Sequence, residues 1–116
     1  MDAETTKIYE LLKQVAIKGG VVTLEEIANL VNFNLDQKAH RKEISKMLDE
    51  ISAHEHKDKR PLLPAVVIAQ DNYNLKLPGK GFFKSAKKLR VFDGIDETSF
   101  YHRELEKVYE HWTSCK

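Results

Sequence analysis

The sequence predicts a mainly α-helical fold with one small β-hairpin, and three observations support this prediction. Three segments in the first half of the chain place apolar residues at the three- and four-residue spacings of amphipathic helices. The segment Thr23-Leu24-Glu25-Glu26 has the form of a helix capping box. A run rich in β-branched residues follows Arg60, where the helical spacing stops. The 116 residues fit one domain, because two ordinary cores would need a longer chain.

The first two helices are predicted in residues 4–17 and from about Leu24 to Val31. The apolar stripe of the first is Ile8, Leu11, Leu12, Val15 and Ala16, and Gly19-Gly20 ends it. The stripe of the second is Leu24, Ile27, Ala28, Leu30 and Val31. We expect Thr23 and Glu26 to satisfy each other's exposed backbone N–H groups.

A third helix is predicted from a cap at Asp36 to about Ser52. Its inward residues are Ile44, Met47, Leu48 and Ile51. Its outward residues are Lys38, His40, Arg41, Lys42, Ser45 and Lys46. The polar stretch from His54 to Arg60 has no periodicity and is typical of a solvated loop.

The hairpin is predicted between Leu62 and Leu77. Its first strand covers the β-branched run that ends at Ala69, and Pro61 and Pro64 confine this strand to a sheet edge or to a start after Pro64. Residues 70–74 are typical of a turn, and residues 75–77 alternate as a short returning strand.

Two further helices are predicted after the hairpin, from Phe82 to about Leu89 and from about Glu97 to Trp112, with a turn at Asp93-Gly94 between them. The last helix carries Phe100, Tyr101, Leu105, Val108 and Trp112 at helical spacing. Because this stripe would otherwise be exposed, we expect the helix to pack in the fold or to form a homodimer interface.

Three helices followed by a hairpin is the element order of a winged helix-turn-helix, which residues 4–77 resemble. Three segments resemble small uncharacterised bacterial and phage proteins, namely Arg60-Pro61-Leu62-Leu63-Pro64-Ala65-Val66-Val67-Ile68, Pro78-Gly79-Lys80-Gly81-Phe82-Phe83 and Glu104-Leu105-Glu106-Lys107-Val108-Tyr109-Glu110-His111-Trp112. The chain length predicts a single domain over residues 1–116, and the winged-helix resemblance implies its organisation. It has a winged-helix core in residues 1–77 and a helical extension in residues 78–116.

Charge is distributed unevenly, although the net charge is only +1. Residues 76–90 hold six basic side chains and no acidic one, while residues 91–116 hold twice as many acidic as basic ones. Such a basic segment beside an acidic one is typical of a nucleic-acid contact or of two complementary faces of one fold.

The predicted function is non-enzymatic binding of duplex DNA, as in a transcriptional regulator. The third helix would enter the major groove, and the basic segment would contact phosphates. The predicted contact residues are Lys38, Arg41, Lys42, Ser45, Lys46, Lys80, Lys84, Lys87 and Lys88. Arg41 is expected to contribute to sequence preference. The alternative is a protein-protein adaptor or inhibitor, such as a phage-encoded antagonist or immunity-type protein, which the near-zero net charge favours.

Other chemistry is less favoured by the sequence. The Gly79-Lys80-Gly81 turn lacks the pattern of a nucleotide-binding loop, and His54-Glu55-His56 with Asp58 lacks a second group of metal ligands. Cys115 is the only cysteine, and no nucleophile elbow is present. We therefore expect no catalysis, no metal and no cofactor.

The sequence also predicts a cytoplasmic protein. The start of the chain, residues 1–6, is acidic and polar where a secretory signal is basic and then apolar. No apolar run approaches the roughly 20 residues that span a bilayer, and a single cysteine forms no internal disulfide.

Overall fold

The structure of the protein is a computed structural model that describes residues 1–69, 77–94 and 96–114. Within these ranges the elements are α1 (Ala3–Ile17), β1 (Val22–Thr23), α2 (Leu24–Leu30), α3 (Lys38–Lys57), the 3-10 turn η1 (Leu63–Val66), β2 (Val67–Ile68), α4 (Lys80–Lys88) and α5 (Glu97–Thr113). The described part of the fold is thus mainly helical, with a small two-stranded sheet.

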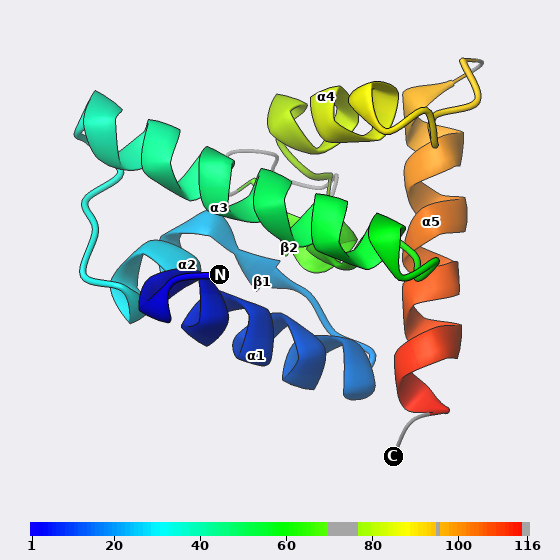
Figure 1. Ribbon diagram of the computed structural model, residues 1–116, viewed down its shortest axis with the longest axis horizontal. Coiled ribbons are helices and arrows are strands. Elements are labelled where there is room, and N and C mark those ends of the chain that lie inside the picture. Colours follow the sequence, from blue (N-terminus) through cyan, green and yellow to red (C-terminus); the bar gives the residue numbers. More distant parts are fainter. Residues whose placement is uncertain (70–76, 95, 115–116) are drawn as a thin grey trace.

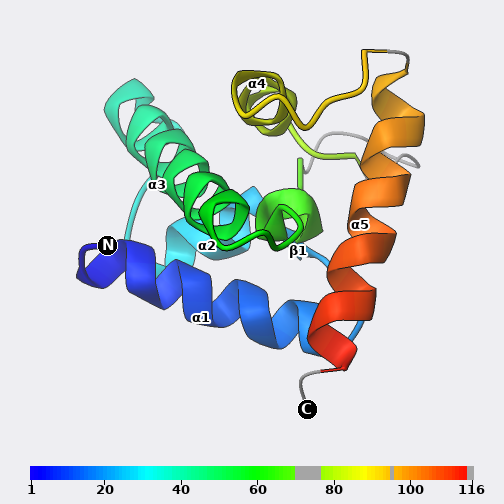
Figure 2. The ribbon, with the colours of Figure 1, turned by 45° about the vertical axis from the view of Figure 1, so that its right-hand side comes forward.

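The helices surround the short 3-10 turn at the centre of the molecule. Helix α3 lies between α1 on one side and α4 on the other, and α5 crosses the ends of α1 and α3 (Figure 1). A rotated view places η1 among α1, α3 and α5 (Figure 2). All four residues of η1 are buried, and the core around them includes Ile8, Leu12, Ile51 and Val108. The centre of the core is therefore a single 3-10 turn enclosed by α-helices.

The first two helices form as the sequence predicts. The Asp2 carboxylate accepts a hydrogen bond of 2.8 Å from the Thr5 backbone N–H at the start of α1, and this bond lowers the pKa of Asp2. The Thr23 hydroxyl oxygen accepts a bond of 3.2 Å from the Glu26 N–H, which confirms the Thr23 half of the predicted capping box. Gly19 ends the first helical segment with a φ of 70°, a left-handed conformation that favours glycine.

The predicted start of the third helix is wrong by one residue, because Gln37 and not Asp36 occupies the cap position. Gln37 precedes α3 and makes no side-chain cap, while the Asp36 backbone N–H bonds to the Asn34 side chain at 2.9 Å. Asp36 therefore belongs to an Asx turn in the connection between the helices, because a local side-chain acceptor competes with helical geometry.

The predicted end of this helix is also wrong, because the supposed loop from His54 is helical through Lys57. Glu55 continues the inward stripe of Ile51 and is fully buried. The Arg60 guanidinium lies 2.5 Å from the Glu55 carboxylate and compensates its charge. Lys59, with a φ of 60°, then turns the chain so that the Arg60 backbone N–H reaches the Glu55 carbonyl at 2.9 Å. The polar segment is thus held helical by the burial of Glu55 and by its contacts with Arg60.

The first strand of the predicted hairpin begins later than its full apolar run. Residues 63–66 form η1, because Pro64 has no N–H to give a sheet and its fixed φ suits a turn. Only Val67 and Ile68 form a strand, and they pair in parallel with Val22 and Thr23. The Ala69 backbone N–H bonds to the Leu77 carbonyl at 2.9 Å, while residues 70–76 of the predicted hairpin lie outside the described residues. The described sheet therefore joins β1 to β2 in parallel.

Both predicted C-terminal helices are present, but α4 begins at Lys80, two residues before its predicted start at Phe82, so Lys80 and Gly81 are helical and not part of a turn. Phe82 and Ala86 of α4 and Phe100, Tyr101 and Val108 of α5 are buried. The apolar stripe of α5 packs against α1 and η1 within one chain, so the stripe no longer argues for a homodimer. None of the helices within the described residues is long and apolar enough to cross a bilayer.

Candidate nucleic-acid interface

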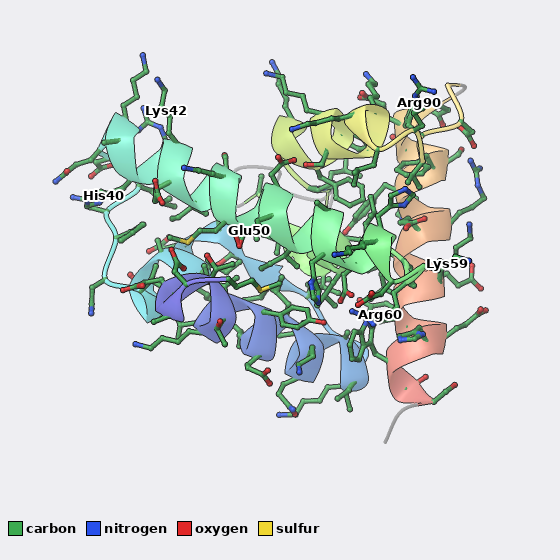
Figure 3. The ribbon with its side chains drawn as sticks, in the orientation of Figure 1. His40, Lys42, Glu50, Lys59, Arg60 and Arg90 are labelled. Carbon is green, nitrogen blue, oxygen red and sulfur yellow. The ribbon has the colours of Figure 1, made fainter. Side chains whose placement is uncertain are left out.

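Two rows of exposed lysines follow neighbouring helices. Residues four apart lie on the same side of an α-helix, so each row runs along one side of its helix. The rows, which we call the lysine face, are Lys38, Lys42 and Lys46 on α3 and Lys80, Lys84 and Lys88 on α4. All six side chains are exposed. In Figure 3, Lys42 near the start of α3 and Arg90 just after α4 lie along the same upper edge of the molecule.

The two rows meet at a shallow groove between α3 and α4. The groove is lined by Ser45, Lys46, Asp49, Gly81, Lys84, Ser85 and Lys88. The Ser85 hydroxyl donates a hydrogen bond to the Asp49 carboxylate, and the Lys88 ammonium lies 3.6 Å from the other Asp49 oxygen. These contacts fasten α4 to α3 and leave Lys46 and Lys84 on the two walls of the groove. The tertiary structure thus joins two basic segments that are separated in the sequence.

Besides Lys88, which pairs with Asp49, two of the predicted contact residues have partners outside the groove. The Lys87 ammonium lies 3.3 Å from the Glu97 carboxylate and over the Phe92 ring, so it binds the start of α5. The Arg41 guanidinium donates a bond of 2.7 Å to the Leu35 carbonyl in the connection before α3. Both side chains are exposed, but each has a partner within the chain.

His40 also contacts other residues of the chain and is not free to bind a ligand through Nδ1. Its Nδ1 accepts a hydrogen bond of 2.8 Å from the Asn34 backbone N–H, and its ring stacks on Phe33 at 4.7 Å between centroids. Together with the Arg41 bond, these contacts fix the path of residues 31–37 between α2 and α3. The position of the third helix relative to the second is therefore held by side chains that the sequence suggested as ligand contacts.

Acidic residues limit the positive surface on one flank. Glu43 and Glu50 are exposed on α3, and Glu50 lies on the lower side of the helix in Figure 3, while Lys42 lies on its upper side. The positive charge of α3 is therefore concentrated on the flank that adjoins α4.

The histidines and the cysteine considered in the sequence analysis do not belong to the lysine face. His54 and His56 are exposed on α3, whereas Glu55 between them is buried and bound to Arg60. Among the residues that the structure describes, no group of three or more His, Cys, Asp or Glu side chains is arranged to hold a metal ion. Cys115 lies outside the described residues.

Sequence reasoning found all the lysines of the face but missed its arrangement. The four-residue spacing within each row is visible in the sequence, whereas the meeting of the rows depends on Asp49 and Ser85, which no motif marks. A scan against protein-family models, a search of curated proteins and a search of solved structures each found no match.

Proposed function

We propose that this protein binds duplex DNA without catalysis and that the lysine face is its contact surface. The observation that supports the proposal is the meeting of two lysine rows, from α3 and α4, at one groove. Duplex DNA carries a phosphate charge about every 1.7 Å of its axis, and lysines that neutralise these charges release counterions and gain affinity.

We further propose that α2 and α3 act as a helix-turn-helix pair of the winged-helix type. The order α1, β1, α2, α3, β2 supports this assignment. Helix α3 would lie in the major groove with Lys42 and Lys46 toward the bases, and Lys80 and Lys84 would contact phosphates on the groove wall. The connection of residues 31–37 is longer than the usual three or four residues.

The test is a titration of fluorescein-labelled duplexes by fluorescence anisotropy at several salt concentrations. Replacing Lys46 or Lys84 with Ala is expected to weaken binding to every duplex. Each loss should reduce the slope of log affinity against log salt by about 0.9, because one phosphate contact disappears. Lys107→Ala on α5 is the matched control, since it removes the same charge from an exposed helix outside the lysine face.

Two results would contradict the proposal. One is a wild-type affinity weaker than about 100 μM at low salt, which is below ordinary non-specific binding. The other is a loss of affinity in Lys107→Ala as large as that in Lys84→Ala. In either case the alternative of a protein-protein adaptor or inhibitor would replace DNA binding.

A further inference from the structure

A second feature of the α3–α4 region is a cavity of about 200 Å³ beneath the groove. Its walls come from the start of α2, from α3, η1 and β2, and from α4 with the two residues before it. The apolar part of the wall consists of Leu24, Leu48, Pro64, Val67, Pro78 and Phe82. A cavity of about 150 Å³ with such walls holds a benzene-sized molecule. This cavity therefore has room for one aromatic ring with a small substituent.

Glycine keeps part of this cavity open. Gly79 and Gly81 both line it, and a Cβ built on either would meet no atom within 4 Å. Neither glycine has a positive φ, so neither is required by its backbone conformation. Glycine also lowers helix stability by up to about 1 kcal/mol relative to alanine. The absence of a side chain at Gly81 thus has no structural benefit, but it leaves space at the cavity wall.

A buried hydroxyl is available at the same cavity. Ser52 lines the cavity and is only 1% exposed. Its hydroxyl forms no hydrogen bond with any residue of the described part of the chain. Ser52 lines the cavity, so a ligand acceptor inside the cavity can take a hydrogen bond from this hydroxyl.

The first turn of α4 supplies further donors. The N–H groups of Lys80 and Gly81 have no acceptor in the helix, and Gly79 provides no side-chain cap. The helix dipole and the Lys80 ammonium make this end of the cavity positive. The Asp49 carboxylate also lines the cavity, and its two oxygens are taken by Ser85 and Lys88. The donors that remain free at the wall therefore favour an acceptor group with negative charge.

We propose that the cavity binds a small organic carboxylate whose apolar body is about the size of one aromatic ring. The body lies among Leu48, Pro64 and Phe82, and the carboxylate accepts hydrogen bonds from Ser52 and from the first turn of α4. This site shares Lys80 with the lysine face, but its other proposed contacts, among them Ser52, Leu48, Pro64 and Phe82, lie outside the lysine rows, so it does not require DNA binding.

The experiment is an amide NMR titration of the ¹⁵N-labelled protein with benzoate, and with benzylamine as a cation of similar shape. Benzoate is expected to give saturable shifts at Lys80, Gly81 and Phe82, with a dissociation constant in the millimolar range or below. Benzylamine should bind at least tenfold more weakly. Absence of saturable shifts with benzoate, or equal affinity for the two compounds, would overturn the proposal.

Two variants locate the site. Gly81→Val fills the cavity wall and should weaken benzoate binding at least tenfold, and Ser52→Ala removes one donor and should weaken it about fivefold. Lys84→Ala is the matched control on α4, because Lys84 lies in the groove and outside the cavity wall. If the amide spectrum of Gly81→Val loses its dispersion, that variant is unfolded, and the benzoate affinity of Ser52→Ala alone tests the site. Unchanged benzoate affinity in Ser52→Ala would overturn the assigned donor and with it the proposed site.

Discussion

The two sides of α3 differ in how they are packed. One side of α3 faces α1, η1 and α5, and we call it the closed side. There, polar side chains of α5 form hydrogen bonds with backbone groups that lie outside the α-helices and the sheet. The Tyr101 hydroxyl donates to the Ala65 carbonyl at 2.8 Å, and the Glu104 carboxylate accepts from the Leu62 N–H at 2.8 Å. The Tyr109 hydroxyl donates to the Gly20 carbonyl at 2.7 Å. This side is closed by hydrogen bonds that specify where η1 lies.

On the side of α4, fewer groups hold the helices together. Within the described residues, the polar contacts between α3 and α4 centre on Asp49, and the two helices border the cavity. Exposed lysines lie along both helices, and like charges contribute no stability to the fold. The comparison indicates that buried hydrogen bonds are concentrated on the α1–α5 side, while open volume and exposed lysines are concentrated on the α3–α4 side. Features that do not stabilise the fold are the ones best explained by binding.

The largest expected effect is from truncation of the aromatic side chain at the centre of the closed side. Tyr101 is fully buried, so Tyr101→Ala should lower the free energy of unfolding by about 4 kcal/mol. Phe83→Ala on α4 is the matched control and should cost about 1 kcal/mol, because Phe83 is half-buried. Urea denaturation followed by circular dichroism measures both. Equal losses in the two variants would remove the distinction between the two sides.

A smaller effect is expected from alkaline pH. Burial raises the pKa of Tyr101 and Tyr109, and burial together with the negative charge of Glu55 raises the pKa of Tyr9 to about 12. Below pH 10 these tyrosines are protonated in both states, so stability is unaffected. Above pH 10 the unfolded chain loses protons that the folded chain keeps, and the free energy of unfolding falls as pH rises.

For Tyr101 alone this fall approaches about 1.4 kcal/mol for each pH unit above 10. Urea denaturation at pH 8 to 11 of wild type and Tyr101→Phe measures it, since the variant lacks the titrating group. The variant should show a shallower decline than wild type. Identical declines would mean that the Tyr101 hydroxyl is not protected by the closed side.

The smallest expected effect has the opposite sign. Gly81→Ala should raise the free energy of unfolding by about 0.5 kcal/mol, because alanine favours helix and its Cβ meets open space. Gly19→Ala is the control and should lower stability by about 1 kcal/mol, since its φ of 70° disfavours a Cβ. Both changes are measured by thermal melting. A loss of stability in Gly81→Ala would mean that the cavity wall is less open than its geometry indicates.

Sequence reasoning located all five α-helices of the described residues because amphipathic spacing is a local property of the chain. The exposure of Lys42 and Lys46 follows from the same spacing, since the opposite side of α3 carries Ile44 and Met47. The extension of α3 to Lys57 could not be predicted in this way. It depends on the contact between Glu55 and Arg60, and on the closed side that buries them.

The sequence by itself determined the helices, the cap at Thr23 and the basic character of residues 76–90, because spacing, capping and charge are carried by neighbouring residues. Only the tertiary structure decided that residues 63–66 turn instead of continuing a strand, that β1 and β2 pair in parallel, and that the lysine rows meet above a cavity. Each of these outcomes depends on residues far apart in the chain. Their energies come from packing and from buried hydrogen bonds, which no local pattern records.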